Sequence, residues 1–309
     1  MKIRYISDLH IDVNEDFPLE LPKSDVFTVV AGDVAGNINK GIPWLKQNVS
    51  NGIVVAGNHI VYGHYDFGET IESLKDKLSD AFPENGPVKF LDVGTGVYKI
   101  VKDGVMFLGS TLYTNYEVTS NHIRNSLSFK MFKTYADKLD EKDSAALKKA
   151  IIDTEMFYSR EGLNDFWKVI KTSPEDYLVY FDRTIAAFEK ALAENEAGDN
   201  LPVVIVTHHA PTEHFIAAPF RSSRINSSFV NNLTPFIESH PSIKAWIAGH
   251  VHARITKRLP NGCWLLSNPR GYYMEMRSYE SQTDYGREPF RNWNSEMFLD
   301  TDDWTVSVK

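Results

Sequence analysis

The sequence has a single cysteine, Cys263, among its 309 residues, so no disulfide bond can form within the chain. Proteins of oxidising compartments commonly depend on several disulfides, and their absence favours a reducing, cytoplasmic location. The apolar Trp264 and Leu265 follow the cysteine directly, which predicts that its thiol is buried and chemically inert.

Long apolar segments are missing as well. A membrane-spanning helix needs about 18 consecutive apolar residues, and no stretch of the sequence approaches that length. Residues 2–6 have the pattern of a strand that runs into polar residues, so a signal peptide is not expected. The sequence therefore predicts no association with a membrane.

Positive charge is in deficit, and the formal net charge of the chain is -8. Proteins that bind nucleic acid through many phosphates need a basic surface, so this class of partner is disfavoured. A small anionic substrate is still compatible with the charge, because bound metal ions can supply positive charge locally. The sequence leaves the oligomeric state open.

Repeats, low-complexity tracts and linkers are also absent, and the apolar share of 42% is ordinary for a globular protein. Apolar runs of strand length alternate with helical patterns in the first third, including a helix at about 42–48. Runs that are apolar at every position predict a sheet covered on both faces. Strands are expected at residues 26–31, 53–56, 88–91, 97–101, 105–108, 203–206 and 245–248.

The composition changes at about residues 116–200, which are rich in Lys, Glu, Asp and Ala with helical periodicity. One helix is expected to begin at Ser173, a good N-cap, with Pro174 in its first turn and acidic residues at the positive end of its dipole. Another helix is expected at about 228–238. The chain therefore predicts one domain over residues 1–309, with a helical insertion at about 116–200 folded over an α/β core.

Five apolar strands end in residues that can bind metal ions. Side chains two positions apart on an extended segment lie on one face, and the carboxyl ends of parallel strands meet at one edge of a sheet. One such motif alone is more often a polar strand end, whereas five in this order indicate a centre for divalent metals. The motifs are Asp8-Leu9-His10, Gly32-Asp33, Gly57-Asn58-His59, His208-His209 and Gly249-His250-Val251-His252.

With these motifs the sequence resembles the calcineurin-like metallophosphoesterases, whose signature is Asp-x-His, Gly-Asp, Gly-Asn-His, His and Gly-His-x-His. The resemblance implies an α/β fold of two packed β-sheets flanked by helices, a four-layer sandwich in which the helical insertion is a cap. It also implies two divalent metal ions, with manganese favoured and iron, nickel, zinc and magnesium as alternatives. His59 would be the acid that protonates the leaving group. The implied ligands are Asp8, His10 and His252 for one metal, Asn58, His208 and His250 for the other, and Asp33 as the bridge.

The sequence also departs from the family pattern. Ile60 stands where the family often has an acidic residue, and Gly36 and Asn37 replace the Asp-Arg pair of the protein phosphatase branch. The residue that orients His59 is therefore open. A local resemblance to a microbial and phage subgroup rests on residues 109–114, 163–166 and 268–272. Candidates for substrate binding are His209, Asn164, Asp165 and Arg270, with a backbone contact, a helix cap or a structural arginine as the alternatives.

These features predict hydrolysis of a small phosphoester by a hydroxide that two metal ions share. A nucleotide-like phosphodiester is favoured, because no arginine that could clamp a monoester dianion occurs between Arg4 and Arg124. A phosphomonoesterase, including a protein phosphatase, is the alternative within hydrolases, and a DNA nuclease is disfavoured by the acidic charge. A non-catalytic binding module of the same fold is the alternative of another class, although it would be expected to lack some of the ligands.

Overall fold

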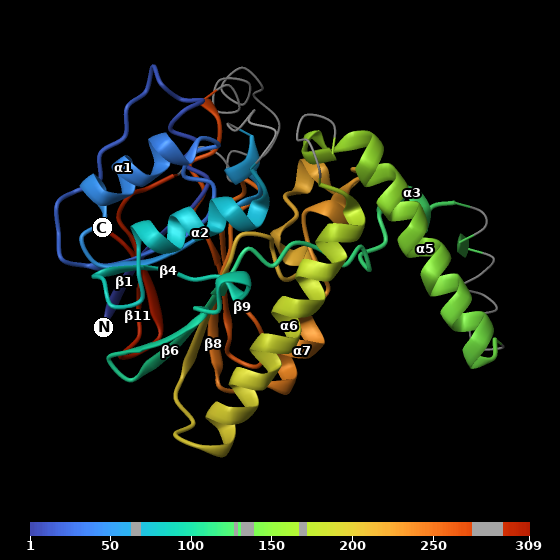
Figure 1. Cartoon of the computed structure of the whole chain (residues 1–309). Coiled ribbons are helices and arrows are strands. Elements are labelled where there is room, and N and C mark those ends of the chain that lie inside the picture. The colour runs from blue at the N-terminus through green and yellow to red at the C-terminus, as the bar shows by residue number, and fades with distance from the viewer. Residues whose placement is uncertain (63–68, 127–128, 131–138, 167–171, 274–292) are drawn as a thin grey trace.

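Two six-stranded sheets form the centre of the molecule (Figure 1). The computed structural model describes residues 1–62, 69–126, 129–130, 139–166, 172–273 and 293–309. The first sheet has the strand order β12-β11-β1-β2-β3-β4, and the second has the order β5-β6-β7-β8-β10-β9. Strands β1 to β4 are parallel, as are β6, β7, β8 and β10, so the carboxyl ends of the central strands lie at one edge of each sheet.

The strands of the first sheet are β1 (Lys2–Ile6), β2 (Phe27–Ala31), β3 (Gly52–Val55), β4 (Val88–Phe90), β11 (Met297–Asp300) and β12 (Thr305–Val308). Those of the second sheet are β5 (Lys99–Lys102), β6 (Val105–Ser110), β7 (Val203–Thr207), β8 (Ile243–Ile247), β9 (Ile255–Arg258) and β10 (Trp264–Ser267). The α-helices of the described part are α1 (Ile38–Asn48), α2 (Ile71–Ala81), α3 (Asn121–Arg124), α5 (Glu141–Gly162), α6 (Pro174–Ala197) and α7 (Thr234–Ser239).

The two sheets pack face to face. Successive side chains of a strand point to opposite faces, so alternate residues of β1 and β2 enter the layer between the sheets. Tyr5 and Val29 lie there in one apolar cluster with Phe107 and Val204 of the second sheet. The rings of Phe27 and Phe107 meet across this layer with their centroids 5.1 Å apart.

Helices cover the outer face of each sheet. The intervening residues of the first sheet, such as Val30, pack against Leu45 of α1 and Leu74 of α2. On the second sheet, Trp246 belongs to a cluster that includes Phe188 of α6. The central strands, such as β2 and β7, are therefore buried on both faces, and the chain forms the four-layer α/β sandwich that the family resemblance implied.

The predicted helical insertion has two parts. Helix α6 begins at Pro174 with a capping box, in which the Ser173 side chain accepts from the Asp176 backbone and Asp176 accepts from the Ser173 backbone. This helix packs on the second sheet, as α7 does, whereas α5 extends away from the sheets (Figure 1). The buried residues of α5 lie in its C-terminal half, so that end brings the following turn, Asn164–Phe166, to the core.

Two expected helices have different bounds. The helix expected at 42–48 begins at Ile38, because the Asn37 side chain accepts from the Asn39 backbone and serves as its N-cap. The helix expected at 228–238 is wrong in its first half, and α7 begins only at Thr234. Asn231 holds the preceding segment in place, since its side chain donates to the Tyr113 carbonyl and accepts from the Asn115 backbone.

Two other predictions concern burial. Cys263 is buried as predicted, and burial raises the pKa of its thiol to about 12. Among the described helices, none combines the length and the apolar composition that a bilayer crossing requires.

Candidate metal centre

The predicted ligands follow the carboxyl ends of β1, β2, β3, β7 and β8, three strands of one sheet and two of the other. Backbone hydrogen bonds join these strand ends to one another. The Asp8 amide donates to the Gly32 carbonyl over 3.1 Å, and the Gly249 amide donates to the His208 carbonyl over 2.9 Å. The fold therefore brings motifs that are distant in sequence to one edge of the sandwich, and the Asp8 carboxylate accepts from the His250 amide across 242 positions.

Most of these residues have a strained backbone. The φ angles of Asp8, His10, Asp33, His250 and His252 are 51°, 44°, 50°, 69° and 46°, in the left-handed region that side-chain-bearing residues rarely occupy. Each such conformation costs about 1–3 kcal/mol and persists only where the surrounding structure enforces it. The strain turns the side chains out of the strand direction and toward a common point.

Two motif glycines make this arrangement sterically possible. A Cβ atom on Gly57 would lie 1.8 Å from the Asp33 carboxylate, and one on Gly32 would lie 2.3 Å from the His208 ring. Gly32 also has a φ of +88°, which favours glycine. Both positions therefore admit no side chain without displacing a predicted ligand.

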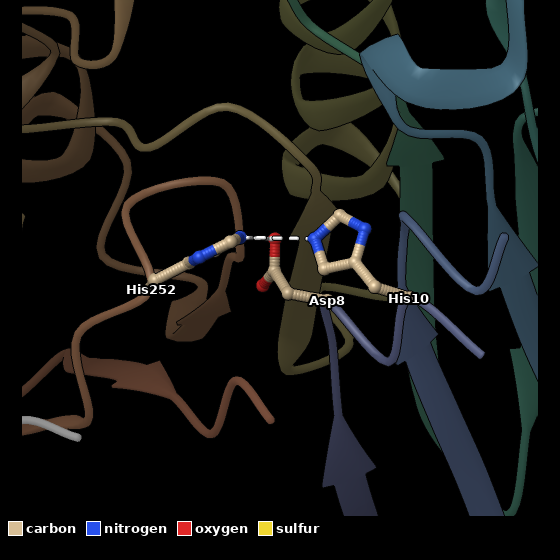
Figure 2. A group of neighbouring side chains, drawn as sticks. All are labelled: Asp8, His10 and His252. Carbon is tan, nitrogen blue, oxygen red and sulfur yellow. Dashed lines mark hydrogen bonds and ion pairs between the residues drawn. The ribbon is translucent and has the colours of Figure 1, made fainter. Parts of the chain in front are cut away.

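Asp8, His10 and His252 form the first cluster (Figure 2). The Nε2 atoms of the two histidines lie 3.0 Å apart, and His252 Nε2 lies 3.5 Å from Asp8 Oδ1. Figure 2 shows both rings directed at the space above the Asp8 carboxylate. The ligand atoms of the three residues all lie within 4.8 Å of one another, a spacing that could hold one metal ion.

Asp33 connects this cluster to a second one, which consists of Asn58, His208 and His250. It belongs to two further groups with the same spacing, one with His10 and His59 and one with Asp8 and His208. His208 Nε2 lies 3.2 Å from Asp33 Oδ2 and 2.9 Å from Asn58 Oδ1. A carboxylate shared between groups could contact two ions, and the bridging role that the family resemblance implies for Asp33 stays a prediction.

His250 completes the second cluster. Its ring lies 5.0 Å from that of His208, centroid to centroid, and Phe229 stacks against it at 4.7 Å. The structure thus brings all seven predicted ligands and His59 together.

Unpartnered atoms test whether a metal fits. Asp8 Oδ2 and His250 Nε2 are buried and have no hydrogen-bond partner within the part of the chain that the structure describes. Buried polar atoms are normally paired, because an unpaired one costs about 1–3 kcal/mol. Imidazole nitrogen and carboxylate oxygen are both good ligands of divalent metals, so the donor set fits such ions.

Protonation also suits metal binding. Burial lowers the pKa of His10 and of His250 well below the ordinary value, which leaves both rings neutral. Burial opposes ionisation of Asp33, but the charge of His208 and those of its other histidine neighbours outweigh it and hold the Asp33 pKa well below the ordinary range. Neutral imidazoles and an ionised carboxylate are the forms that bind metals.

His208 behaves differently. Burial would lower its pKa, but the Asp33 carboxylate outweighs burial and raises the pKa to about 9. The Ala31 carbonyl, 3.0 Å away, can only accept, so Nδ1 carries a hydrogen and Nε2 is the atom directed at Asn58 and Asp33. The hydrogen bond from Nδ1 to the Ala31 carbonyl orients the ring, as such bonds do for histidine ligands in metal sites.

His59 lies at the rim of the cluster, and its side chain is 18% exposed. Its ring stacks on Tyr62 with centroids 4.2 Å apart and planes 6° from parallel, and its backbone donates to Asp33 Oδ1. The Tyr272 hydroxyl lies 3.1 Å from His59 Nε2. Tyr272 is thus the contact partner that the sequence left open, and it ends the stretch 268–272 that carried the local resemblance.

Asp165 has a role that sequence reasoning missed. Both of its carboxylate oxygens accept from Asn58 Nδ2, at 3.0 and 2.9 Å, and the hydroxyls of Tyr62 and Tyr177 donate to it as well. The residue is 1% exposed. These contacts fix the Asn58 amide so that its oxygen points toward His208, and they tie the helical insertion to the metal centre.

The other candidates for substrate binding lie in different surroundings. Asn164 is exposed and lines the cavity in front of the metal centre. His209 is fully buried with its ring 4.1 Å from that of His250, and it is not among the residues that line this cavity. Arg270 donates to the carbonyls of Leu9 and Phe17, away from the cavity lining.

The cavity in front of the metal centre has a volume of about 420 Å³. Its lining includes the predicted ligands Asp33, Asn58, His250 and His252, together with His59 and Tyr272. No lysine or arginine belongs to its lining in the described part of the chain. The apolar residues of its lining include Leu163, Ile216, Phe220, Ile225, Phe229 and Val251.

No protein-family model and no curated protein sequence matches the chain. Among solved structures, it is similar to the phosphopantetheinyl hydrolase from Mycobacterium tuberculosis, with a TM-score of 0.58 and 19% sequence identity over 92% of this chain and 93% of that one. A dimetal phosphatase from Danio rerio matches with a TM-score of 0.46 and 13% identity over 86% of each chain. The first similarity establishes the fold, which is that of the calcineurin-like metallophosphoesterases.

Proposed function

We propose that this protein is a metal-dependent phosphoester hydrolase that prefers small phosphodiesters. The observation that carries the proposal is the convergence of seven potential ligands from five strand ends, with Asp33 shared between neighbouring groups. Seven ligands are more than one tetrahedral site can use, so the set suits two ions. Two bound ions would supply a nucleophilic hydroxide and would neutralise charge on the phosphoryl oxygens.

His59 is proposed to be the acid. It is partly exposed, lines the cavity and contacts a second proton-carrying group, the Tyr272 hydroxyl. A positioned acid that protonates the departing alkoxide accelerates such a reaction by about 100- to 10,000-fold. Tyr62, stacked on the ring, and Asp33, which accepts from the His59 backbone, hold the imidazole in place.

The preference for diesters follows from the lining of the cavity. Enzymes that favour the dianion of a monoester commonly add a bidentate arginine to the metal charge, and the described lining has neither arginine nor lysine. A diester has one negative charge and a second organic substituent. The apolar part of the lining, which includes Phe220 and Phe229, would receive that substituent.

Metal removal tests the hydrolase proposal. Treatment with a chelator should abolish turnover of bis-p-nitrophenyl phosphate, and addition of Mn²⁺ should restore it, with iron, nickel, zinc and magnesium as comparisons. Undiminished turnover by the metal-free protein would refute the proposal. A protein that binds two metals and yet hydrolyses no ester would instead be the binding module of the same fold.

The ratio of kcat/KM for bis-p-nitrophenyl phosphate to that for p-nitrophenyl phosphate tests the diester preference. We expect a ratio well above one at matched pH and metal concentration. A clear preference for the monoester would favour a phosphomonoesterase. Because one structural neighbour is a phosphopantetheinyl hydrolase, phosphopantetheinyl diesters belong in the substrate panel.

A further inference from the structure

A second cavity adjoins the one in front of the metal centre. It has a volume of about 290 Å³ and shares Ile216 and Asn226 with the first cavity. Asn226 is a largely buried residue that contributes to the lining of both cavities. Its side chain donates to the Phe220 carbonyl over 2.9 Å. Phe220 lines the first cavity and the next residue, Arg221, lines the second, so the two cavities meet along one short loop.

The second cavity is rich in cations. Arg124 of α3, Arg221 and Lys257 of β9 line it, and Glu213 is the one carboxylate among its lining residues in the described part of the chain. The three cations come from separate elements and converge on one hollow, although the chain as a whole has a net charge of -8. By contrast, the lining of the first cavity has no cationic side chain of lysine or arginine.

Cationic side chains outnumber carboxylates three to one in the described lining of this cavity. Glu213 accepts from Arg124 over 2.6 Å, which pairs one cation with the one carboxylate. Lys257 Nζ lies 3.0 Å from His214 Nδ1. Burial and then the charge of Lys257 lower the His214 pKa, so this ring is a neutral acceptor and does not offset the lysine charge.

We propose that this second cavity, lined by Arg124, Arg221 and Lys257, binds a second anionic group of the substrate, a phosphate or a carboxylate. The proposal rests on the proposed hydrolase function and deepens it. The scissile phosphate would lie at the metal centre, the apolar part of the first cavity's lining would receive the intervening part, and the remote anion would enter the cationic cavity. A hollow of about 290 Å³ can enclose a phosphate, and arginine with lysine is the combination that proteins use for such groups.

Two substrates that differ only in the remote anion test the proposal. They are the p-nitrophenyl ester of thymidine 5′-phosphate and the same ester with an additional 3′-phosphate. We expect the 3′-phosphate to raise kcat/KM by about tenfold, chiefly through a lower KM, as one charge-assisted contact does. In Lys257→Ala and in Arg221→Ala, the ratio of the two kcat/KM values should fall toward one.

Arg258→Ala is the matched control. Arg258 neighbours Lys257 on the exposed edge strand β9 but does not line the cavity, and adjacent residues of a strand face opposite sides. This variant should keep the wild-type ratio. A ratio near one in the wild type, or an equal fall in all three variants, would overturn the proposal.

Direct binding separates this inference from the proposed function. Calorimetry of the metal-free protein with thymidine 3′,5′-bisphosphate should detect binding that Lys257→Ala weakens by about tenfold and Arg258→Ala leaves unchanged. Absent turnover of every ester would refute the hydrolase proposal but not this binding result. Binding of an acidic polypeptide such as polyglutamate, without binding of the bisphosphate, would assign the cavity to a protein partner and refute the substrate subsite.

Discussion

Replacement of Asp165 by asparagine tests the contact that joins the helical insertion to the metal centre. In the native protein both carboxylate oxygens accept from Asn58 Nδ2. Asparagine places an NH2 group where one of these oxygens lies, so two donors would face each other or the Asn58 amide would rotate. Rotation would present nitrogen in place of oxygen to a metal at this position.

Two estimates of the free-energy cost of Asp165→Asn agree. A buried donor left without an acceptor costs about 1–3 kcal/mol. Substitution of a residue that orients a metal ligand typically lowers metal affinity by about 10- to 100-fold, which corresponds to about 1.4–2.8 kcal/mol. We therefore expect Asp165→Asn to weaken the metal site of Asn58 and His208 by about 10- to 100-fold. The site of Asp8, His10 and His252 should change much less.

Competition of each variant with a chromophoric chelator for Mn²⁺ measures both affinities. Asp153→Asn on α5 is the matched control, because it makes the same change in charge at an exposed carboxylate whose partner is Lys149. Tyr177→Phe removes one hydroxyl from Asp165 but keeps the contact to Asn58, and should have a smaller effect. Equal affinities in Asp165→Asn and Asp153→Asn would refute the positioning role. Unchanged metal binding with altered substrate preference would return Asp165 to the substrate-binding role that the sequence predicted.

Three other predictions follow from single contacts. His59→Asn should retain both metals and slow esters with poor leaving groups far more than nitrophenyl esters; equal losses in a leaving-group series would exclude it as the acid. Gly57→Ala should lower metal content, measured by atomic emission, because the new Cβ would lie 1.8 Å from Asp33 in the native backbone, and normal occupancy would contradict this. Burial raises the pKa of Glu155 above its ordinary value of 4.5 despite its hydrogen bonds to Ser120 and Ser227. Its contribution to the unfolding free energy is therefore present below pH 4.5 and lost as the pH rises through the raised value. The wild type should thus gain stability relative to Glu155→Gln on acidification, in urea denaturation, and a constant difference would refute this.

Local sequence patterns predicted the core because they reflect local physics. Runs such as 26–31 are apolar at every position, and β2 is indeed buried on both faces between α1 and the second sheet. The capping signal at Ser173 likewise depends only on the next three residues, and the structure has that capping box. The pattern at 228–238 failed for the opposite reason, since contacts of Asn231 with residues more than 100 positions away hold that segment out of a helix.

The same contrast between local patterns and long-range contacts holds for the candidate metal centre. The sequence by itself determined which strand ends have ligands, because the spacing of two residues and the flanking glycines are local features. Only the tertiary structure decided what supports these residues: Asp165 meets Asn58 from 107 positions away, and Tyr272 meets His59 from 213 positions away. It also decided that Arg270 faces backbone carbonyls and that Arg221 joins Arg124 and Lys257 at a second cavity. Contacts of this kind depend on how separate elements pack, and no short-range pattern in the sequence specifies them.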